Sequence, residues 1–224
     1  MRNRPLKPLA AGVLLLLTLT GCTTLIGAPL GSRADGSGTP GGPAAAPGGA
    51  PADLDGSRVA RAALELVGER NLSVRGRRFN YDCTGTILAA YYAAGYDLAA
   101  GFGAYTGNGV RRLYLMAEDR GTLRSRAPLR PGDIVFWDNS YDRNGDRRWN
   151  DELTHAGIVV DVARDGTVTY VHHNYRRGVV AAEMNVLQPS NLNKNSPMRM
   201  ASHRWRKSDP WLSGELYRAH GALY

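Results

Sequence analysis

The chain has 224 residues, of which 43% are hydrophobic, and its formal net charge is +8. Its arginines form several short, separate clusters, which is typical of a solvated surface. Only two cysteines are present, Cys22 and Cys83, so the composition excludes more than one intrachain disulfide.

An export signal is expected at residues 1–21. Three basic residues precede an apolar run at residues 9–19, which is too short to span a bilayer as a permanent helix. The run ends in L-T-G-C, which resembles the bacterial lipobox, where the cysteine is acylated and becomes the new N-terminus. The resemblance implies a lipid anchor on Cys22. An ordinary secretory signal followed by an incidental cysteine is the alternative.

A lipid on Cys22 predicts both location and partners. Thr23 follows the cysteine, a pattern that in Gram-negative lipoproteins implies sorting to the outer membrane. We therefore expect a lipid-anchored protein of the bacterial cell envelope, at the outer membrane and facing the periplasm. Nucleic acid is not an expected partner of an exported lipoprotein, whereas anionic lipid or wall polymer could contact the basic clusters.

Composition divides the rest of the chain into two parts. Residues 22–52 are rich in Gly, Ala and Pro and read as a disordered tether. Residues 53–224 have the length of one domain. Its expected helices come first and its strands follow, which predicts an α+β fold. The expected helices are 55–68, 83–94, 110–119 and 211–223, and the expected strands are 133–137, 154–162, 167–174, 179–186 and 199–207.

Cys83 opens the second expected helix. Ile87, Ala90, Tyr91 and Ala94 follow it at helical spacing. Unpaired N–H groups and the helix dipole at this end favour a thiolate over a thiol. If Cys22 is lipidated, Cys83 has no intrachain partner, so it is a reactive thiol, an intermolecular bridge or a buried inert side chain.

Two histidines could serve such a thiol. His155 opens the strand at 154–162, and His172 lies on the strand that returns after the Asp165-Gly166 turn. Neighbouring strands lie about 4.8 Å apart, which allows a hydrogen bond between the two imidazoles. His173 points to the opposite face, so only one of the pair can take part. A single histidine is usually a satisfied core residue, but the joint pattern favours a nucleophile, a base and an orienting group.

Four segments carry a family resemblance. The D-C-T-G stretch at 82–85 resembles the D-C-S-G motif of NlpC-type cell-wall cysteine peptidases, and segments 129–137, 154–159 and 165–172 resemble their later motifs in the same order. The related CHAP family shares this order. The resemblance implies a papain-like α+β fold, in which N-terminal helices present the nucleophile to a central antiparallel sheet.

The same resemblance implies roles for individual residues. Cys83 would be the nucleophile, His155 the base and His172 its orienting partner, and no cofactor would be needed for catalysis. Members of the family often keep a hydroxyl near the thiolate, so Tyr81, with Asp82, is a candidate to support the thiolate or the substrate.

An insertion at residues 139–153 spaces oxygen ligands as calcium loops do. The ligand at the seventh position would be a backbone carbonyl, and a carboxylate would close the site. An EF-hand is excluded because the sixth position is not glycine and the twelfth is leucine. The sequence therefore predicts a structural Ca²⁺ site, with an ordinary solvated polar loop as the alternative. The candidate ligands are Asp142, Asn144, Asp146, Arg148 and Asp151, with Glu152 as a substitute for Asp151.

These patterns together predict a lipid-anchored hydrolase that cuts an amide bond of peptidoglycan. Stem-peptide endopeptidase and N-acetylmuramoyl-L-alanine amidase activity are equally compatible with the sequence. A catalytically silent wall-binding scaffold on the same fold is one rival. A thiol acyltransferase that acts on lipid or amino groups is the other.

Overall fold

The computed structural model describes residues 51–224. The predicted signal at 1–21, the lipidated Cys22 and almost all of the tether at 22–52 lie outside the described residues. Within residues 51–224, no helix has the length and apolar character needed to cross a membrane.

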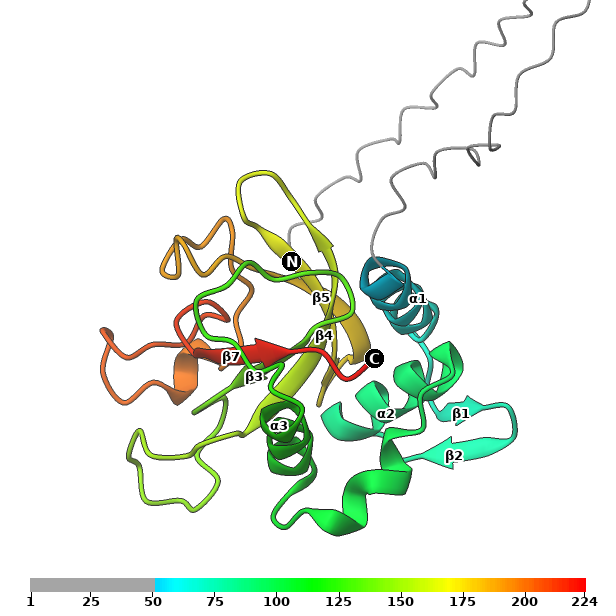
Figure 1. Cartoon of the computed structure of the whole chain (residues 1–224). Helices are drawn as coiled ribbons and strands as arrows, with labels where there is room; N and C mark the ends of the chain where they lie inside the picture. The colour runs from blue at the N-terminus through cyan, green and yellow to red at the C-terminus, as the bar shows by residue number, and fades with distance from the viewer. Residues whose placement is uncertain (1–50) are drawn as a thin grey trace, which may run out of the picture. The chain divides into compact units, whose positions relative to one another are not determined.

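Three α-helices precede the main sheet in this part of the chain (Figure 1). The first helix begins four residues earlier and ends three residues earlier than the helix predicted at 55–68. The second has the predicted bounds, because Gly95 ends it in the left-handed conformation, with φ of 103°. A 3₁₀ segment, η1, precedes the third helix. The bounds are α1 Pro51–Glu65, α2 Cys83–Ala94, η1 Leu98–Ala104 and α3 Gly109–Asp119.

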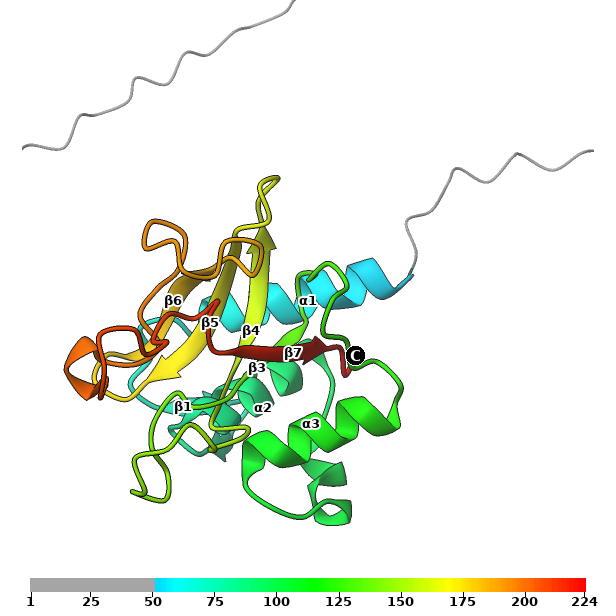
Figure 2. The same cartoon turned by 90° about the vertical axis from the view of Figure 1, so that its left-hand side faces the viewer.

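A five-stranded antiparallel sheet follows, in the order β6-β5-β4-β3-β7 (Figure 2). Strands β3 to β6 lie within two residues of their predicted bounds. Helices packed on an antiparallel sheet confirm the predicted α+β, papain-like class. The strands are β3 Ile134–Trp137, β4 His155–Val162, β5 Val168–Asn174, β6 Gly178–Met184 and β7 Tyr217–Gly221.

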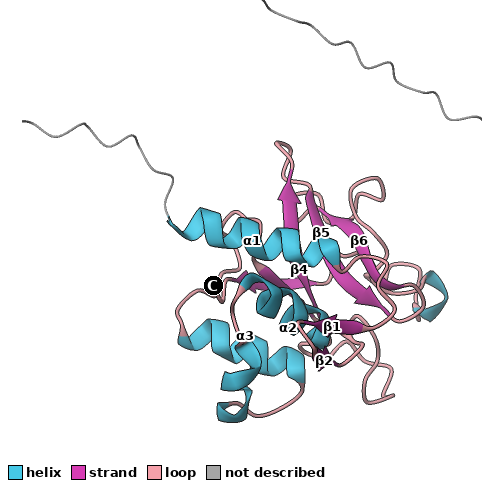
Figure 3. Cartoon of the chain, turned by 90° about the vertical axis from the view of Figure 1, so that its right-hand side faces the viewer, coloured by secondary structure: helices cyan, strands magenta, loops and turns pink. Residues whose placement is uncertain are grey.

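The sheet has an apolar core on each face. Helices α1 and α2 lie against one face of the sheet (Figure 3). Because side chains alternate along a strand, Ala156 and Ile158 of β4 face these helices, while Val159 faces away from them. On the far face, Val159 packs with Trp137 and Tyr170. Both faces of the sheet are therefore covered, which holds the strands rigidly at the candidate site.

A small hairpin lies where residues 70–82 were predicted to be loop. Strand β1, Leu72–Val74, pairs with β2, Arg77–Phe79. Arg75 and Gly76 join them with φ values of 49° and 79°. Two successive positive φ angles match the twist of a two-residue hairpin. The prediction missed it because arginine is an unusual residue at such a position.

The predicted strand at 199–207 and the predicted closing helix at 211–223 are both wrong. The first region contains only a short 3₁₀ turn, η2 Ala201–His203, and the second contains β7. Every residue of β3 is buried, so this strand needs a hydrogen-bonded neighbour on each edge. Strand β4 pairs with one edge of β3 and β7 pairs with the other. This requirement comes from residues far away in the sequence, so the local helical spacing at 211–223 cannot reveal it.

Gly85 allows α2 to begin where it does. An alanine Cβ at this position would collide with the Asn80 carbonyl, which belongs to backbone and cannot rotate away. We expect Gly85→Ala to lower the free energy of unfolding by at least about 2 kcal/mol, measured by thermal melting. Gly103→Ala is the matched control, since its Cβ would meet no atom within 4 Å. Equal melting temperatures for the two variants would contradict this packing.

Candidate active site

Asp82 fixes the first turn of α2, where Cys83 lies. Its backbone is extended, with φ of −148°, and its carboxylate accepts a hydrogen bond from the Gly85 N–H at 2.7 Å. Its carbonyl accepts from the Thr86 N–H at 3.0 Å. These bonds make Asp82 the N-cap of the helix. Cys83 is thereby held at the first helical position, whose N–H has no acceptor one turn earlier.

The Cys83 thiol lies against the start of β4. The backbone N–H of Ala156 hydrogen-bonds to the sulfur, and Thr84 also contacts it. Strand β4 pairs with β5 only from Ile158 onward, which lies opposite Val171. The thiol therefore accepts a hydrogen bond from a backbone N–H at the end of the sheet. This N–H belongs to Ala156, the residue after His155.

His155 and His172 form the hydrogen bond that was predicted from the pairing of their two strands. His155 Nε2 lies 2.8 Å from His172 Nδ1, and His172 is almost fully buried. Gly157 makes room for this pair. A Cβ there would lie 2.9 Å from the Val171 carbonyl and 3.2 Å from the His172 Cβ. The small residue after His155 and Ala156 is thus required by the close approach of the second histidine.

This hydrogen bond also limits the tautomers. If the Nε2 atom of His155 carries the proton, it donates to His172 Nδ1, and His155 Nδ1 keeps a lone pair. A base with its lone pair on Nδ1 and its other nitrogen held by a partner is suited to take a proton from a thiol.

Burial shifts the pKa values of the three side chains in a consistent way. Burial, followed by the nearby Asp82 carboxylate, raises the pKa of Cys83, and the Ala156 N–H opposes the rise. Burial and the neighbouring His173 lower the pKa of His155 to about 4. Burial and His155 lower the pKa of His172 well below its ordinary value. At pH 7 these shifts favour a neutral thiol beside a neutral imidazole, rather than the thiolate expected from the helix terminus alone.

The Tyr81 hydroxyl bonds to backbone, instead of supporting the Cys83 thiolate as had been predicted. The phenol donates to the Glu69 carbonyl at 2.7 Å. Its ring stands edge-on to His173, with centroids 4.5 Å apart. Tyr81 therefore anchors the turn before Cys83. His173 lies on the other face of β5 from His172, and its buried Nε2 has no hydrogen-bond partner.

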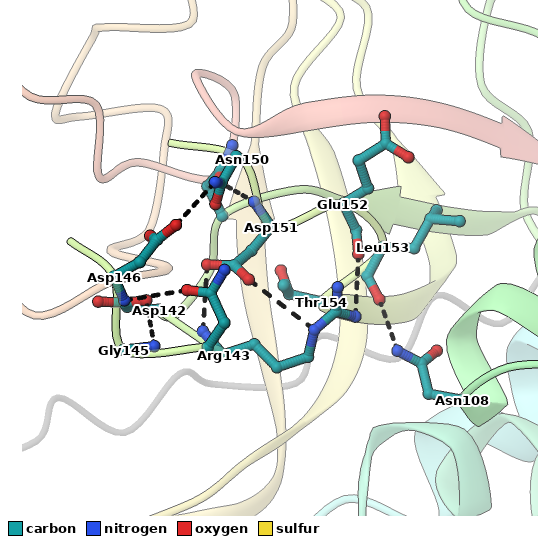
Figure 4. A network of polar contacts seen from close by, with 12 residues as sticks. Asn108, Asp142, Arg143, Gly145, Asp146, Asn150, Asp151, Glu152, Leu153 and Thr154 are labelled. Atoms are coloured by element: carbon teal, nitrogen blue, oxygen red, sulfur yellow. Dashed lines mark hydrogen bonds and ion pairs between the residues drawn. The ribbon is translucent and has the colours of Figure 1, made fainter. Parts of the chain in front are cut away.

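The insertion at 139–153 is folded around its own polar side chains (Figure 4). Each predicted side-chain ligand accepts a backbone N–H of the same loop, at 2.8–3.1 Å. Asn139 and Asp151 close the base of the loop with two hydrogen bonds. The acceptor–donor pairs are Asp142 with Gly145 and Arg147, Asn144 with Asp146, Asp146 with Arg148, and Asp151 with Arg143.

The structure does not gather these side chains into a recognisable metal centre. Across residues 51–224, no three His, Cys, Asp or Glu side chains are grouped as ligands of one ion. The buried Asp151 carboxylate has a cationic neighbour instead, since Arg143 Nε lies 3.8 Å from it. Calcium binding stays a prediction, and the loop's internal hydrogen bonds account for its shape without an ion.

Comparison with known families identifies the matched region. The family model of the CHAP domain matches residues 74–174, from β1 to the last residue of β5. A CHAP domain is thus found at residues 74–174. CHAP domains are generally cysteine amidases or peptidases that act on peptidoglycan, and they generally need no cofactor for catalysis. No curated protein and no solved structure gave a significant match.

The CHAP match covers Cys83, His155 and His172, and the predicted NlpC/CHAP superfamily is thereby confirmed. Sequence reasoning missed the Ala156 N–H, and it named Asp82 as a candidate to support the thiolate or the substrate but not as the N-cap of α2. A capping signal was present, because an aspartate before an apolar helical run is a common N-cap. The Ala156 donor had no such signal, since any residue supplies the same N–H.

Alkylation of Cys83 tests the electrostatics of the site. In Cys22→Ala protein, Cys83 is the only thiol. Because burial raises the pKa of the Cys83 thiol, we expect the iodoacetamide rate to stay low at pH 7 and to rise only at a higher pH than in the unfolded chain. The urea-unfolded chain is the control and titrates at the ordinary value. A rate already at its plateau by pH 7 would instead show a preformed thiolate.

Calcium binding by the 139–153 loop is tested by thermal melting. We expect added Ca²⁺ to raise the melting temperature and a chelator to lower it, because a bound ion would tie together several carboxylates of the loop. Asp146→Ala should abolish both shifts, whereas Asp161→Ala, outside the loop, should retain them. An unchanged wild-type melting temperature would remove calcium from this loop.

Proposed function

We propose that the protein is a peptidoglycan amidohydrolase in which Cys83 attacks the scissile carbonyl. The observation that carries the proposal is the 2.8 Å contact between His155 and His172, at the strand end where the Ala156 N–H contacts the thiol. A nucleophile, a base and a group that orients the base are the parts that thiol catalysis needs.

The proposed reaction begins with proton transfer. His155 accepts the thiol proton on Nδ1 as the sulfur bonds to the carbonyl carbon, and the resulting imidazolium then protonates the leaving amine. This step breaks the C–N bond and leaves a thioester. Water attacks the thioester with His155 again as base, which releases the carboxylic acid and restores the thiol. His172 holds the ring of His155 throughout.

The start of α2 supplies a candidate oxyanion hole. The Cys83 N–H lies in the first helical turn, where it has no acceptor one turn earlier. The helix dipole adds positive potential at the same point. Negative charge that develops on the carbonyl oxygen during attack by the sulfur would be stabilised there.

The scissile bond lies either within the stem peptide or between muramic acid and L-alanine. Both are amides, and the proposed chemistry is the same for each. We further propose that the enzyme works at the bacterial envelope, held to the outer membrane by a lipid on Cys22, with residues 22–52 as a tether. This placement would bring a membrane-bound catalytic domain within reach of the wall.

Digestion of purified sacculi tests the proposed function. We expect wild type to release soluble fragments and Cys83→Ala to release none above background. His155→Ala should lower the rate by about 10²–10⁴-fold, because it removes the general base. Arg164→Ala, an exposed residue in the turn between β4 and β5, at the end of the hairpin opposite His155 and His172, is the control. Mass analysis separates intact stem peptides, made by an amidase, from shortened stems, made by an endopeptidase.

Two outcomes would contradict the proposal. Equal release by wild type and Cys83→Ala would remove Cys83 from the mechanism. Binding of folded wild type to sacculi without any release would support a silent scaffold instead. Melting temperatures within a few degrees of wild type are required for each variant, so that loss of fold is not mistaken for loss of chemistry.

A further inference from the structure

A pocket of about 510 Å³ lies between the 139–153 insertion and the segment around η2. The two segments lie at the same end of the sheet in Figures 1 and 2. The volume is within the range of small-ligand sites. The residues that contribute most to its chemistry are Tyr141, Asp142, Arg147, Arg199, His203 and Trp205.

Arg199 forms the rigid wall of this pocket. Its side chain is stacked on two indole rings, with its guanidinium carbon 4.5 Å from the Trp149 centroid and 4.8 Å from that of Trp205. The residue is only 5% exposed. Such stacking fixes the guanidinium plane and shields it from water.

The charge of Arg199 is not neutralised by a direct partner. Among residues 51–224 no carboxylate lies within ion-pair distance of it, and its side chain donates one hydrogen bond, to the Asn139 carbonyl at 3.2 Å. The charges of Asp142, Asp151 and Asp209 act on it from farther away. Its buried Nε has no acceptor. A buried guanidinium nitrogen without an acceptor is costly, and a ligand oxygen that accepted a hydrogen bond from this side chain would reduce that cost.

The remaining charged groups of the pocket favour an anionic ligand. Asp142 is its one acidic residue, and both carboxylate oxygens already accept backbone N–H groups, from Gly145 and Arg147. Arg147 adds a second cation, on an exposed side chain. Tyr141 and Trp205, at 51% and 38% exposure, offer aromatic surface beside these charges.

The pocket is connected to the strand that carries His155. The Ser140 hydroxyl and Thr154 Oγ1 lie 2.8 Å apart, and Thr154 directly precedes His155. Ser140 is followed by Tyr141 of the pocket. Arg199, His203 and Trp205 lie beyond residue 174, outside the matched CHAP region. Four of the eight lining residues therefore lie outside the matched region, and the Ser140–Thr154 contact joins the pocket to the strand of His155.

We propose that this pocket is a substrate subsite that binds a free carboxylate of the wall peptide. The inference rests on the proposed function for the identity of the substrate. Arg147 contacts the carboxylate, Arg199 supplies fixed positive potential behind it, and the exposed aromatic rings contact the attached peptide.

Tryptophan fluorescence tests the subsite without any need for activity. The full chain carrying Cys83→Ala is titrated at constant ionic strength with N-acetyl-trialanine and with its C-terminal amide. We expect a saturable change with the free acid and at least tenfold weaker binding of the amide. Arg147→Gln should weaken binding of the acid at least fivefold. Arg148→Gln is the matched control, because the neighbouring arginine is also exposed but does not line the pocket.

Hydrolysis of sacculi by the same arginine variants, with Cys83 intact, gives a second readout. We expect Arg147→Gln to raise KM with kcat within twofold of wild type. Equal binding of acid and amide, or equal effects of the two arginine variants, would overturn the subsite. Carboxylate binding by a protein that hydrolyses nothing would overturn the proposed function and leave the subsite standing. Hydrolysis without carboxylate binding would do the reverse.

Discussion

The contact between the first turn of α2 and the start of β4 is the constraint on which the candidate site depends. The Asp82 cap, the absence of a side chain at Gly85 and the Ala156 N–H together place one sulfur atom at the end of the sheet. Neither element could do this alone. The helix supplies direction and the dipole, and the strand supplies the donor and the adjoining imidazole.

Burial determines how this site would work chemically. An isolated thiol at a helix N-terminus is expected to be acidic. Here the loss of solvent around Cys83 and the nearby Asp82 charge outweigh the two backbone donors, and the pKa rises. The same desolvation keeps His155 neutral. In the proposed mechanism, proton transfer during attack then replaces a standing ion pair, and His155 has the role of general base.

Much of the fold and of the candidate site could be predicted from the sequence, because the signals were local. Helical spacing and Gly95 fixed the bounds of α2, and the Asp165-Gly166 turn indicated that β4 pairs with β5, on which His172 lies. The bulge between Val159 and Asp161, which shifts the pairing on the way to the histidines, had no such signal. The end of the chain could not be predicted in this way. Strand β7 exists because β3 is buried and needs a second neighbour, and that requirement lies about 80 residues away in the sequence.

The hydrogen bonds at the base of the 139–153 insertion have a consequence for how the domain can vary. Asn139 and Asp151 bond to each other twice, so the chain leaves the sheet and returns to it at a closed junction. Because the cost of closing a loop changes only slowly with its length, the exposed residues 144–148 between them can be lengthened, shortened or exchanged at little cost to the sheet, whereas Trp149 is packed against Arg199. The tip of the insertion can thus change in sequence while the strands that carry His155 and His172 stay in place. Under the proposed function, such changes would alter which wall peptide is recognised.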